Sequence, residues 1–354
     1  MKIALDAMGG DHGPRPCVEG AVLAVQRFNI EVILVGQGRA IRRFLSALKH
    51  GDDPRIQVLD APDVVLMTDQ PRDSLRKKNS SLAMAVDLVK QGQADAAVSP
   101  ANTGAFMAHA LLSWRTLPGI KKPAIAAMLP TARDRVVIID SGAVVDCRPH
   151  QLMNFGIMGS TYARVILGRD NPRVGLISNG EEETKGNELT IAAHQLLRRT
   201  GLNFTGNAEG RDIWSGEFDV IVADGFVGNV ILKTSEGLAK MIMEQLKREA
   251  MKRFSTMIGG ALMMPAARAL KRRTDYDETG GAPLLGVNGI AIICHGSSNS
   301  KAIMNALRVA AESHSRKLVA QLAADLQRYH AHLEKSGVSH EVVMGEKPPE
   351  FGKT

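Results

Sequence analysis

Six short segments rich in glycine or asparagine follow apolar runs in this chain, and they carry the side chains best suited to chemistry. They are 6–14 (DAMGGDHGP), 99–105 (SPANTGA), 178–188 (SNGEEETKGNE), 206–212 (GNAEGRD), 224–229 (DGFVGN) and 295–302 (HGSSNSKA). Five of them fall where a β-strand is expected to lead into a helix. Loops at the carboxyl ends of parallel strands form the ligand crevice of such sheets, and glycine lets backbone N–H groups approach an anion. Together the segments predict a phosphate-sized pocket.

The segment 178–188 has the strongest chemical content, because Lys185 directly precedes a helix expected to begin at Gly186. The first N–H groups of a helix are unpaired and its dipole favours anions, so a lysine beside them is typical of a phosphate clamp. The alternative is an ordinary surface helix start, in which the acids at 181–183 complement the dipole. Spacing alone leaves both interpretations open.

Polar side chains at other strand ends have two interpretations as well. Asn102, Thr103 and Asn229 could orient a carbonyl or phosphate oxygen, or they could cap the helices that follow. His12 follows a GGD sequence and His295 leads into GSSNS, where an imidazole could act as acid, base or oxyanion donor. The occurrence of six such loops in one chain favours the functional interpretation.

Composition excludes several classes of protein. The chain has 354 residues, 44% hydrophobic and 23% charged, which is typical of a soluble α/β protein. Asp6 interrupts the first apolar stretch, as a signal peptide would not allow, and no run reaches the ~18 apolar residues of a membrane span. We therefore expect a cytoplasmic protein.

Neither a metal nor a cofactor is expected from the sequence. Cys17, Cys147 and Cys294 have no metal-binding spacing, no HxxxH pattern occurs, and small buried cysteines are the simplest interpretation. Gly36 and Gly38 form part of a dinucleotide-binding fingerprint, but its third glycine is replaced here. A plain strand-to-helix turn is the expectation at that position.

Positive charge is concentrated in one part of the chain. The net charge is +7, and residues 240–275 hold nine cations and three acids. Such a patch predicts an anionic partner, which could be nucleic acid, lipid headgroups or an acidic protein. Aromatic residues make up only 4% of the chain and offer few stacking platforms for nucleic acid, so the other two partners are favoured.

Apolar runs alternate with helical patterns along most of the chain, which predicts a mostly parallel sheet covered on both faces. Strands are expected near 2–5, 32–35, 56–59, 94–98, 124–129, 136–139, 174–177, 220–222 and 290–294. Helices are expected near 14–28, 39–49, 80–90, 104–114, 149–167, 186–199, 229–254 and 299–333. The runs 124–129 and 136–139 are too close for a crossover and predict an antiparallel pair. We expect one α/β unit over 1–336 and an irregular tail over 337–354.

An insertion at about 240–281 is predicted to protrude from this unit as a helical hairpin. Apolar residues recur at steps of three and four from Met243 to Met264 and would form one stripe, which Lys247 and Arg253 flank. Gly259, Gly260 and Pro265 are expected to interrupt the helix. The stripe, with Phe254 and Met257 near its centre, could lie on an anionic membrane or pack against a second copy of the chain.

Seven motifs, in this order across nearly the whole chain, resemble those of the bacterial phosphate acyltransferases of phospholipid synthesis, the PlsX family. They are DAMGGDHGP, SPANTGA, ISNGEEETKGNE, GNAEGRDI, DGFVGNVILKTSEG, GGAPLLGVNG and HGSS. The resemblance implies a three-layer α/β/α sandwich, Rossmann-like and similar to phosphotransacetylases and isocitrate dehydrogenases. It also implies a membrane-associated cytosolic homodimer. Such an enzyme transfers a long acyl chain from acyl carrier protein to inorganic phosphate, giving acyl phosphate for a membrane glycerol-3-phosphate acyltransferase.

On this basis we expect catalytic roles for Lys185, His12, His295 and Asn229. The expected phosphate- and substrate-binding residues are Asp6, Gly9, Gly10, Asp11, Ser99, Asn102, Thr103, Asn179, Gly180, Gly186, Asp224, Gly225, Gly228, Gly296 and Ser297. The expected membrane or dimer contacts are Phe254, Met257, Lys247 and Arg253. Two alternatives remain, namely a short-chain phosphotransacetylase that uses coenzyme A and a non-catalytic membrane-associated scaffold of lipid synthesis. Nucleic acid is not an expected partner.

Overall fold

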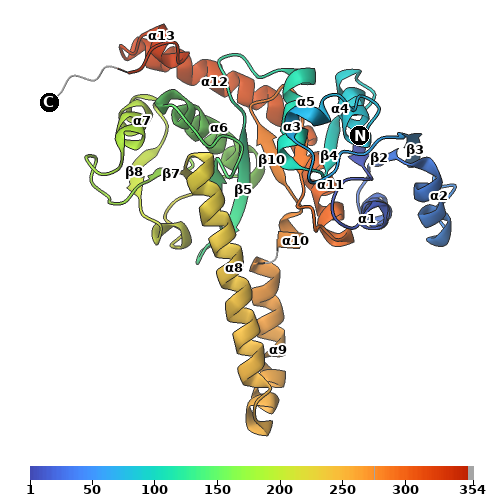
Figure 1. Cartoon of the computed structure of the whole chain (residues 1–354). Coiled ribbons are helices and arrows are strands. Elements are labelled where there is room, and N and C mark those ends of the chain that lie inside the picture. Colours follow the sequence, from blue (N-terminus) through green and yellow to red (C-terminus); the bar gives the residue numbers. More distant parts are fainter. Residues whose placement is uncertain (275, 350–354) are drawn as a thin grey trace.

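The computed structural model describes residues 1–274 and 276–349, which form an eleven-stranded sheet with helices on both faces (Figure 1). The strand order is β3-β2-β1-β4-β11-β10-β5-β6-β9-β7-β8. The strands are β1 (Lys2–Asp6), β2 (Glu31–Gly36), β3 (Ile56–Asp60), β4 (Ala96–Ser99), β5 (Ala124–Pro130), β6 (Arg135–Ile139), β7 (Val174–Ile177), β8 (Phe204–Ala208), β9 (Val220–Val222), β10 (Ala282–Leu285) and β11 (Ala291–Ile293). The expected mostly parallel α/β architecture is confirmed.

Helices connect most of these strands, as the alternation of apolar patterns predicts. They are α1 (Pro14–Arg27), α2 (Gly38–Ala47), α3 (Pro71–Ser74), α4 (Ser81–Lys90), α5 (Thr103–Trp114), α6 (Pro149–Leu167), α7 (Glu188–Arg199), α8 (Gly225–Ala250), α9 (Phe254–Thr274), α10 (Tyr276–Thr279), α11 (Ser300–Ser315), α12 (Leu318–Lys335) and α13 (His340–Val343). A single 3₁₀ turn, Asp212–Trp214, adds to them. Helix α6 is buried over most of its length, which explains why its apolar residues surround the whole helix rather than one stripe.

The two halves of the sheet run toward each other. Strands β3, β2, β1, β4 and β11 are mutually parallel, and so are β6, β9, β7 and β8. Between them β10 is antiparallel to both β11 and β5, and β5 is antiparallel to β6, as its proximity in sequence predicts. The end of β11 at Ile293 pairs with Ala282, and the end of β6 at Ile139 pairs with Ala126. The carboxyl ends of the two halves therefore meet near the middle of the sheet.

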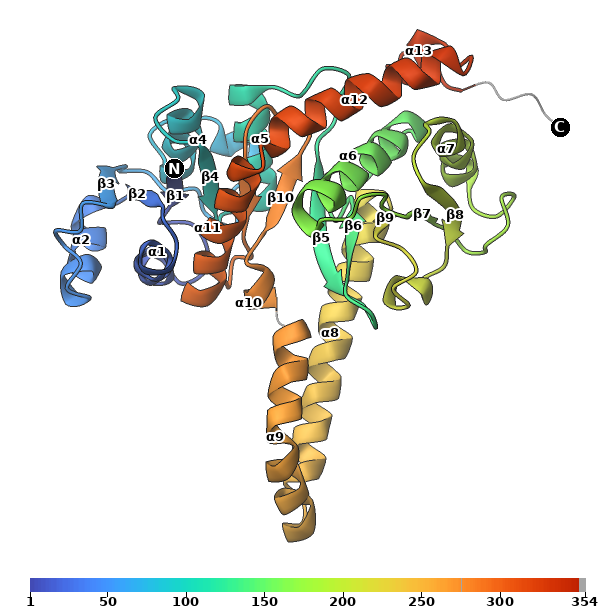
Figure 2. The same ribbon diagram turned by 180° about the vertical axis from the view of Figure 1, so that it is seen from behind.

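Separate apolar clusters pack on the two halves. One joins β1, β2 and β4 to α1 and α11, and another joins β6, β7 and β9 to α6, α7 and α12. Helix α12 crosses the side of the molecule away from the projecting helices (Figure 2). Each half is thus a rigid platform for the loops at its strand ends.

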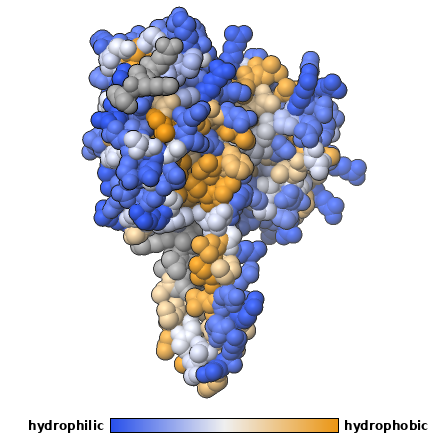
Figure 3. Space-filling view, turned by 60° about the vertical axis from the view of Figure 1, so that its left-hand side comes forward, coloured by the Kyte–Doolittle hydropathy of each residue, from blue (hydrophilic) through white to orange (hydrophobic). Residues whose placement is uncertain are grey.

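Helices α8 and α9 lie side by side and project from the body of the protein (Figures 1 and 2). Their apolar side chains remain exposed: Phe254 is 75% exposed and Leu262 is 78% exposed. Figure 3 shows apolar residues gathered along one side of this stem and hydrophilic residues along the other. A stem with so much exposed apolar surface is typical of an interaction site.

The prediction of one apolar stripe interrupted at Gly259, Gly260 and Pro265 is wrong. The chain turns earlier, at 251–253, and α9 continues through all three residues. Pro265 is exposed, so water can bond the carbonyl group that its missing N–H leaves unpaired. The stripe is consequently divided between two helices. Predicted cations from Arg268 onward lie among residues whose side chains are not described.

Other differences arise where sequence signals are short. Strands β8 and β10 were not expected, because FTGNA contains glycine and asparagine and APLL contains a proline. The single helix expected over 299–333 is two helices, separated at Lys317, whose φ is +54°. The expected irregular tail contains α13; Val343 of this helix and Val338 just before it are buried in one cluster with Met153 of α6.

None of the helices in the described part of the chain is both long enough and apolar enough to span a bilayer.

Candidate active site

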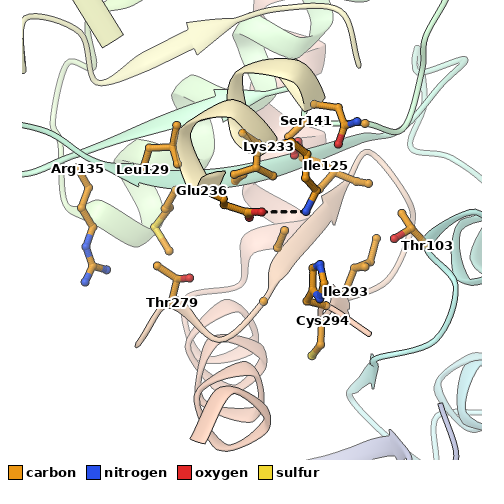
Figure 4. A pocket seen from close by; sticks show the side chains of 18 of the residues that line it. Thr103, Ile125, Leu129, Arg135, Ser141, Lys233, Glu236, Thr279, Ile293 and Cys294 are labelled. Atoms are coloured by element: carbon orange, nitrogen blue, oxygen red, sulfur yellow. Dashed lines mark hydrogen bonds and ion pairs between the residues drawn. The ribbon is translucent and has the colours of Figure 1, made fainter. Parts of the chain in front are cut away.

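A cleft of about 300 Å³ lies where the two halves of the sheet meet (Figure 4). Polar residues from both halves line one end of it, and β5 and α8 form much of its remaining wall. Its lining residues are Thr103, Ile125, Ala127, Met128, Leu129, Pro130, Arg135, Ser141, Gly142, Asn229, Leu232, Lys233, Glu236, Thr279, Gly281, Ala282, Ile293, Cys294 and His295. Of the expected catalytic residues, the cleft brings Asn229 and His295 together.

A buried carboxyl group organises the loops on one side of the cleft. Asp6 is 1% exposed and accepts hydrogen bonds from the N–H groups of Met8 and Gly9 at 3.1 and 3.2 Å. The Ser99 hydroxyl donates to Asp6 Oδ2 at 2.7 Å and accepts from the Ala101 N–H at 3.0 Å. Burial raises the pKa of Asp6 above its ordinary value. Asp6 and Ser99 therefore position backbone rather than face the cleft.

Asp140 performs the same function at the end of β6. Its fully buried carboxyl group accepts hydrogen bonds from the N–H groups of Ile125, Gly142, Ala143 and Val144, at 2.7 to 3.1 Å. Burial raises its pKa, and these hydrogen bonds oppose that change. The turn that they fix presents Ser141 and Gly142 to the cleft. The position of Asp140 directly after an apolar run is the sequence signal for this residue.

Close backbone approaches bring three of the predicted loops together. A Cβ atom at Gly10 would lie 2.7 Å from the carbonyl oxygen of Gly296, and one at Gly9 would lie 2.8 Å from the nitrogen of Ala101. Asp11 donates its N–H to the Gly296 carbonyl at 2.8 Å. The loops after β1, β4 and β11 thus pack against each other with no room for side chains at these glycines.

The contacts of His295 Nδ1 favour one tautomer of the neutral imidazole. The Ser297 backbone N–H can only donate, and it lies 3.2 Å from His295 Nδ1, so Nδ1 is an acceptor. The Ser297 hydroxyl lies 2.7 Å from the same nitrogen and also donates to it in the neutral form. The proton of the neutral ring is then on Nε2. A His295 ring in this state can donate to an oxyanion in the cleft.

Several predicted residues have structural roles in the helices that follow them. Asn102 caps α5 by accepting from the Ala105 N–H at 3.1 Å and donates to the Met67 carbonyl at 2.9 Å. Asp224 caps α8 by accepting from the Val227 N–H at 2.9 Å. The capping interpretation accounts for both side chains. His12 is exposed and does not line the cleft.

The Lys185 segment borders a second cavity, of about 380 Å³, on the other side of the first turn of α8. Asn179, Gly186 and Asp224 line this cavity, whereas Lys185 is exposed beside it. The helix start predicted at Gly186 is wrong by two residues: α7 begins at Glu188, because Asn187 caps it by accepting from the Thr190 N–H at 2.9 Å. Gly186 instead has a φ of +116°.

Two further observations support an anion site at this second cavity. The Ser178 hydroxyl lines it, and no described residue gives that buried oxygen a hydrogen-bond partner. Within the described residues, no acid lies within 4 Å of the Lys185 ammonium, whereas neighbouring Glu183 and Glu181 pair with Arg198 and Arg211. Gly180 packs against the Lys185 side chain, since a Cβ atom there would lie 2.7 Å from Cγ of the lysine.

Sequence reasoning missed the residues at the far end of the main cleft. Arg135, Lys233, Glu236 and Thr279 line it, and Lys233 pairs with Glu236 at 2.9 Å. Figure 4 shows Arg135 and Thr103 on opposite sides of the cleft, with Ile125 between them. Arg135 opens β6 and follows the turn from β5, but no local motif marks it as a ligand-binding residue.

One other group of acids and the single acid Asp60 have local explanations. Oxygens of Glu181, Glu209 and Asp212 lie within 4.8 Å of one another, the one such group among the described residues, and Arg211 pairs with all three. Asp60 accepts from the Gly38 N–H at 2.6 Å and so closes the turn into α2. These acids therefore already have partners within the protein, namely the Arg211 guanidinium group and the Gly38 N–H.

The sequence of this chain is similar to those of known proteins. Residues 1–321 match the model of a family described as fatty acid synthesis protein. A phosphate acyltransferase of Pelotomaculum thermopropionicum is 49% identical over 328 residues, covering 92% of this chain and 95% of the relative. One of Desulforamulus reducens is 50% identical over 328 residues, covering 92% and 98%.

Solved structures with low sequence identity share the fold. A phosphotransacetylase from Streptococcus pyogenes aligns with a TM-score of 0.60 at 16% identity, covering 92% of this chain and 94% of that one. A phosphotransacetylase from Staphylococcus aureus aligns with a TM-score of 0.55 at 13% identity, covering 91% and 94%.

Proposed function

This chain belongs to the fatty acid synthesis protein family and is an acyltransferase that uses phosphate, and we propose that its donor is a long acyl chain on acyl carrier protein. The family match and the identity to phosphate acyltransferases establish the class of enzyme and confirm the resemblance seen in the sequence. The description of the family favours a fatty acyl donor. The observation that carries the proposal is the cleft in which polar groups of both halves of the sheet converge.

In the proposed reaction an oxygen of phosphate attacks the thioester carbonyl carbon directly. A new carbon–oxygen bond forms, the carbon–sulfur bond breaks, and the sulfur leaves as a thiolate. A thiol with a reference pKa of about 8.5 needs little protonation to leave. The tasks of the enzyme are therefore to hold phosphate against the thioester and to stabilise the oxyanion. No covalent acyl-enzyme is required.

Within the main cleft, His295 Nε2–H, the Thr103 hydroxyl and the Asn229 amide are proposed to contact the oxyanion or the attacking phosphate. The supporting observations are that all three residues line the cleft and that the tautomer of His295 leaves a donor on Nε2. Gly142 lies close to Asn229, since a Cβ atom at Gly142 would be 3.7 Å from the asparagine side chain. His12 is exposed and does not line the cleft, so it is not among these proposed contacts.

Phosphate is proposed to reach the polar end of the main cleft from the side on which Lys185 lies. Asn179 and Gly186 line the second cavity there, and the buried Ser178 hydroxyl offers an additional hydrogen bond. The start of α8 borders both cavities, with Asp224 and Val227 lining the second cavity and Asn229 lining the main cleft. An anion held by Lys185 would thus be near the reaction centre.

The projecting stem is proposed to join the enzyme to the inner face of the membrane and to a second subunit. Near the turn, Met251 and Phe254 are 65% and 75% exposed, and Lys247 and Arg253 lie beside them. Apolar side chains with neighbouring cations are typical of segments that bind anionic bilayers. Leu238, Met241 and Ile242 form an exposed apolar face on α8 that suits a homodimer contact. Membrane contact would place acyl phosphate near a glycerol-3-phosphate acyltransferase.

A comparison of donors tests the proposed function. Thiol release should require phosphate and should be faster with palmitoyl-acyl carrier protein than with acetyl-coenzyme A. Faster release from acetyl-coenzyme A would instead establish a short-chain phosphotransacetylase. A lack of phosphate-dependent release from any donor would favour the scaffold.

A further inference from the structure

The outer half of the main cleft is bordered by the edge of a strand. Strand β10 pairs only with Ala124 and Ile125 of β5, so the next residues have no described partner strand on that side. The consecutive residues from Ala127 to Pro130 all line the cleft, as expected where an edge rather than a face borders a cavity. An unpaired edge offers backbone N–H and C=O groups to an extended ligand.

The direction of these backbone groups follows from the pairing on the other side of β5. Ile125 donates its N–H to Asp140 Oδ1 at 2.9 Å and accepts from the Ser141 N–H at 3.0 Å, so both of its groups point toward β6. Backbone directions alternate along an antiparallel strand. Ala127 and Leu129 therefore also point toward β6, and the N–H and C=O of Met128 point toward the cleft.

A cation lies at the outer end of this edge. Arg135 pairs in register with Pro130 and lines the cleft, and within the described residues no acid lies within 4 Å of its guanidinium group. Lys233, close by on α8, already pairs with Glu236. Five strand steps from Ile125 to Pro130 span about 16 Å. The cleft thus has the polar reaction end at one side, a mostly buried apolar strand edge in the middle and an arginine at the other side (Figure 4).

We propose that the outer half of the cleft binds the phosphopantetheine arm of the donor, with Arg135 on its phosphate and the Met128 backbone on one of its amides. This inference rests on the proposed function, because it requires a thioester donor. About thirteen bonds separate sulfur from phosphorus in the arm, equivalent to about four extended residues, or roughly 15 Å. That length matches the distance from the reaction end to Arg135.

The chemistry of the arm also matches the wall of the cleft. Its amide groups satisfy the edge of β5, which a purely hydrocarbon chain would leave without hydrogen bonds at a cost in free energy. Leu129 and Leu232 offer apolar contact to its methyl and methylene groups. Arginine is suited to bidentate contact with a phosphate monoester or diester.

The test compares two donors that differ only in the phosphate of the arm. Acyl-phosphopantetheine and acyl-pantetheine with the same acyl group are assayed with inorganic phosphate at saturation, using wild type, Arg135→Ala and Arg133→Ala. Arg133 is exposed in the turn before β6 and does not line the cleft, so it is the matched control. Loss of a charge-assisted contact should lower kcat/KM for acyl-phosphopantetheine by about 10- to 100-fold in Arg135→Ala. In the same variant kcat/KM for acyl-pantetheine should fall by less than about twofold. Arg133→Ala should leave kcat/KM unchanged for both donors.

The deciding quantity is the ratio of kcat/KM for acyl-phosphopantetheine to kcat/KM for acyl-pantetheine. Both values are measured on the same preparation of each variant, so a lower fraction of folded protein does not change their ratio. An unchanged ratio in Arg135→Ala would overturn the assignment. If that variant is inactive with both donors, Arg135→Lys decides, because it should retain a preference for the phosphorylated arm and a lost preference would overturn the proposal. A wild-type enzyme inactive with every thioester donor would contradict the proposed function itself. An active wild type with an unchanged ratio would contradict only the assignment of the arm.

Discussion

The carbonyl oxygen of Asp140 lies 1.9 Å from the position that a Cβ atom would occupy at Gly228. The first turn of α8 therefore packs directly on the loop that follows β6, and no side chain fits between them. This contact fixes Asn229 beside Gly142 in the cleft. It is the point at which α8, whose outer part belongs to the stem, meets the loop that carries Ser141 and Gly142 to the cleft.

Gly228→Val should consequently reduce acyl transfer strongly, because α8 must move away from Asp140 or the loop must open. Gly237→Ala is the control, since a Cβ atom there meets open space in the same helix. That substitution should preserve activity and stabilise the helix by about 0.5–1 kcal/mol. Steady-state rates and thermal melts measure both effects. A Gly228→Val enzyme with normal rate and phosphate saturation would show that this contact does not shape the site.

His150 should make stability fall in weak acid. Its ring is buried, and desolvation followed by the charges of Lys121 and Arg148 lowers its pKa from 6.5 to about 4. The folded protein thus binds this proton less readily than the unfolded chain. The stabilisation is complete above pH 6.5 and is lost as the pH falls toward about 4, on the order of 3 kcal/mol in all.

Urea unfolding of wild type and His150→Phe across this pH range isolates the contribution. The variant has no imidazole to protonate, so its unfolding free energy should decline less steeply between pH 6.5 and 4. Other acids, including Asp6 and Asp140, titrate in both proteins and cancel in the difference. Parallel curves would contradict the assignment to His150.

Lys185→Ala should impair turnover at low phosphate more than His12→Ala or His295→Ala. An anion site that loses its charge should lose on the order of 10² in rate at low phosphate, whereas His12 does not line the cleft and loss of His295 leaves Thr103 and Asn229 to contact the oxyanion. Lys90→Ala, an exposed lysine at the end of α4, controls for a general change in charge. Near-normal rates of Lys185→Ala at low phosphate would remove Lys185 from the site.

The pair Phe254→Asp and Met257→Asp should abolish binding to anionic vesicles while soluble acyl transfer continues. Both side chains are exposed, at 75% and 49%, so charges there should repel lipid without unfolding the stem. Leu112→Asp is the control, because Leu112 is 70% exposed on α5, away from the stem. Sedimentation with vesicles and the mass in solution are the measurements. Unchanged binding would exclude the membrane role, and a joint loss of dimer mass and activity would identify a subunit interface.

The sequence predicted the elements within each half of the sheet better than the strand that joins the two halves. The apolar pattern of α6 gave its bounds without error, since burial imposes a long uninterrupted helix there. Strand β10, which joins the halves, consists of four residues with a proline and lacks any periodic signal. Its antiparallel register depends on β11 and β5, which lie elsewhere in the chain.

The candidate site likewise contains residues that local sequence signals predicted and residues that they did not. Asn229 and His295 were predicted because their loops follow apolar runs, and both residues line the cleft. The same signal also selected Asn102 and Asp224, whose side chains cap helices, because a strand end is a helix start in an alternating fold. Arg135 was missed, because its place opposite Thr103 arises only from the pairing of β5 with β6.

The most direct measurement of the central claim is mass spectrometry of the products from palmitoyl-acyl carrier protein and isotopically labelled phosphate. Direct attack predicts palmitoyl phosphate that retains every labelled oxygen of the phosphate, with one free carrier thiol released per product. It also predicts no release of carrier when phosphate is omitted. Release of carrier without phosphate, or free fatty acid as the first product, would contradict the account.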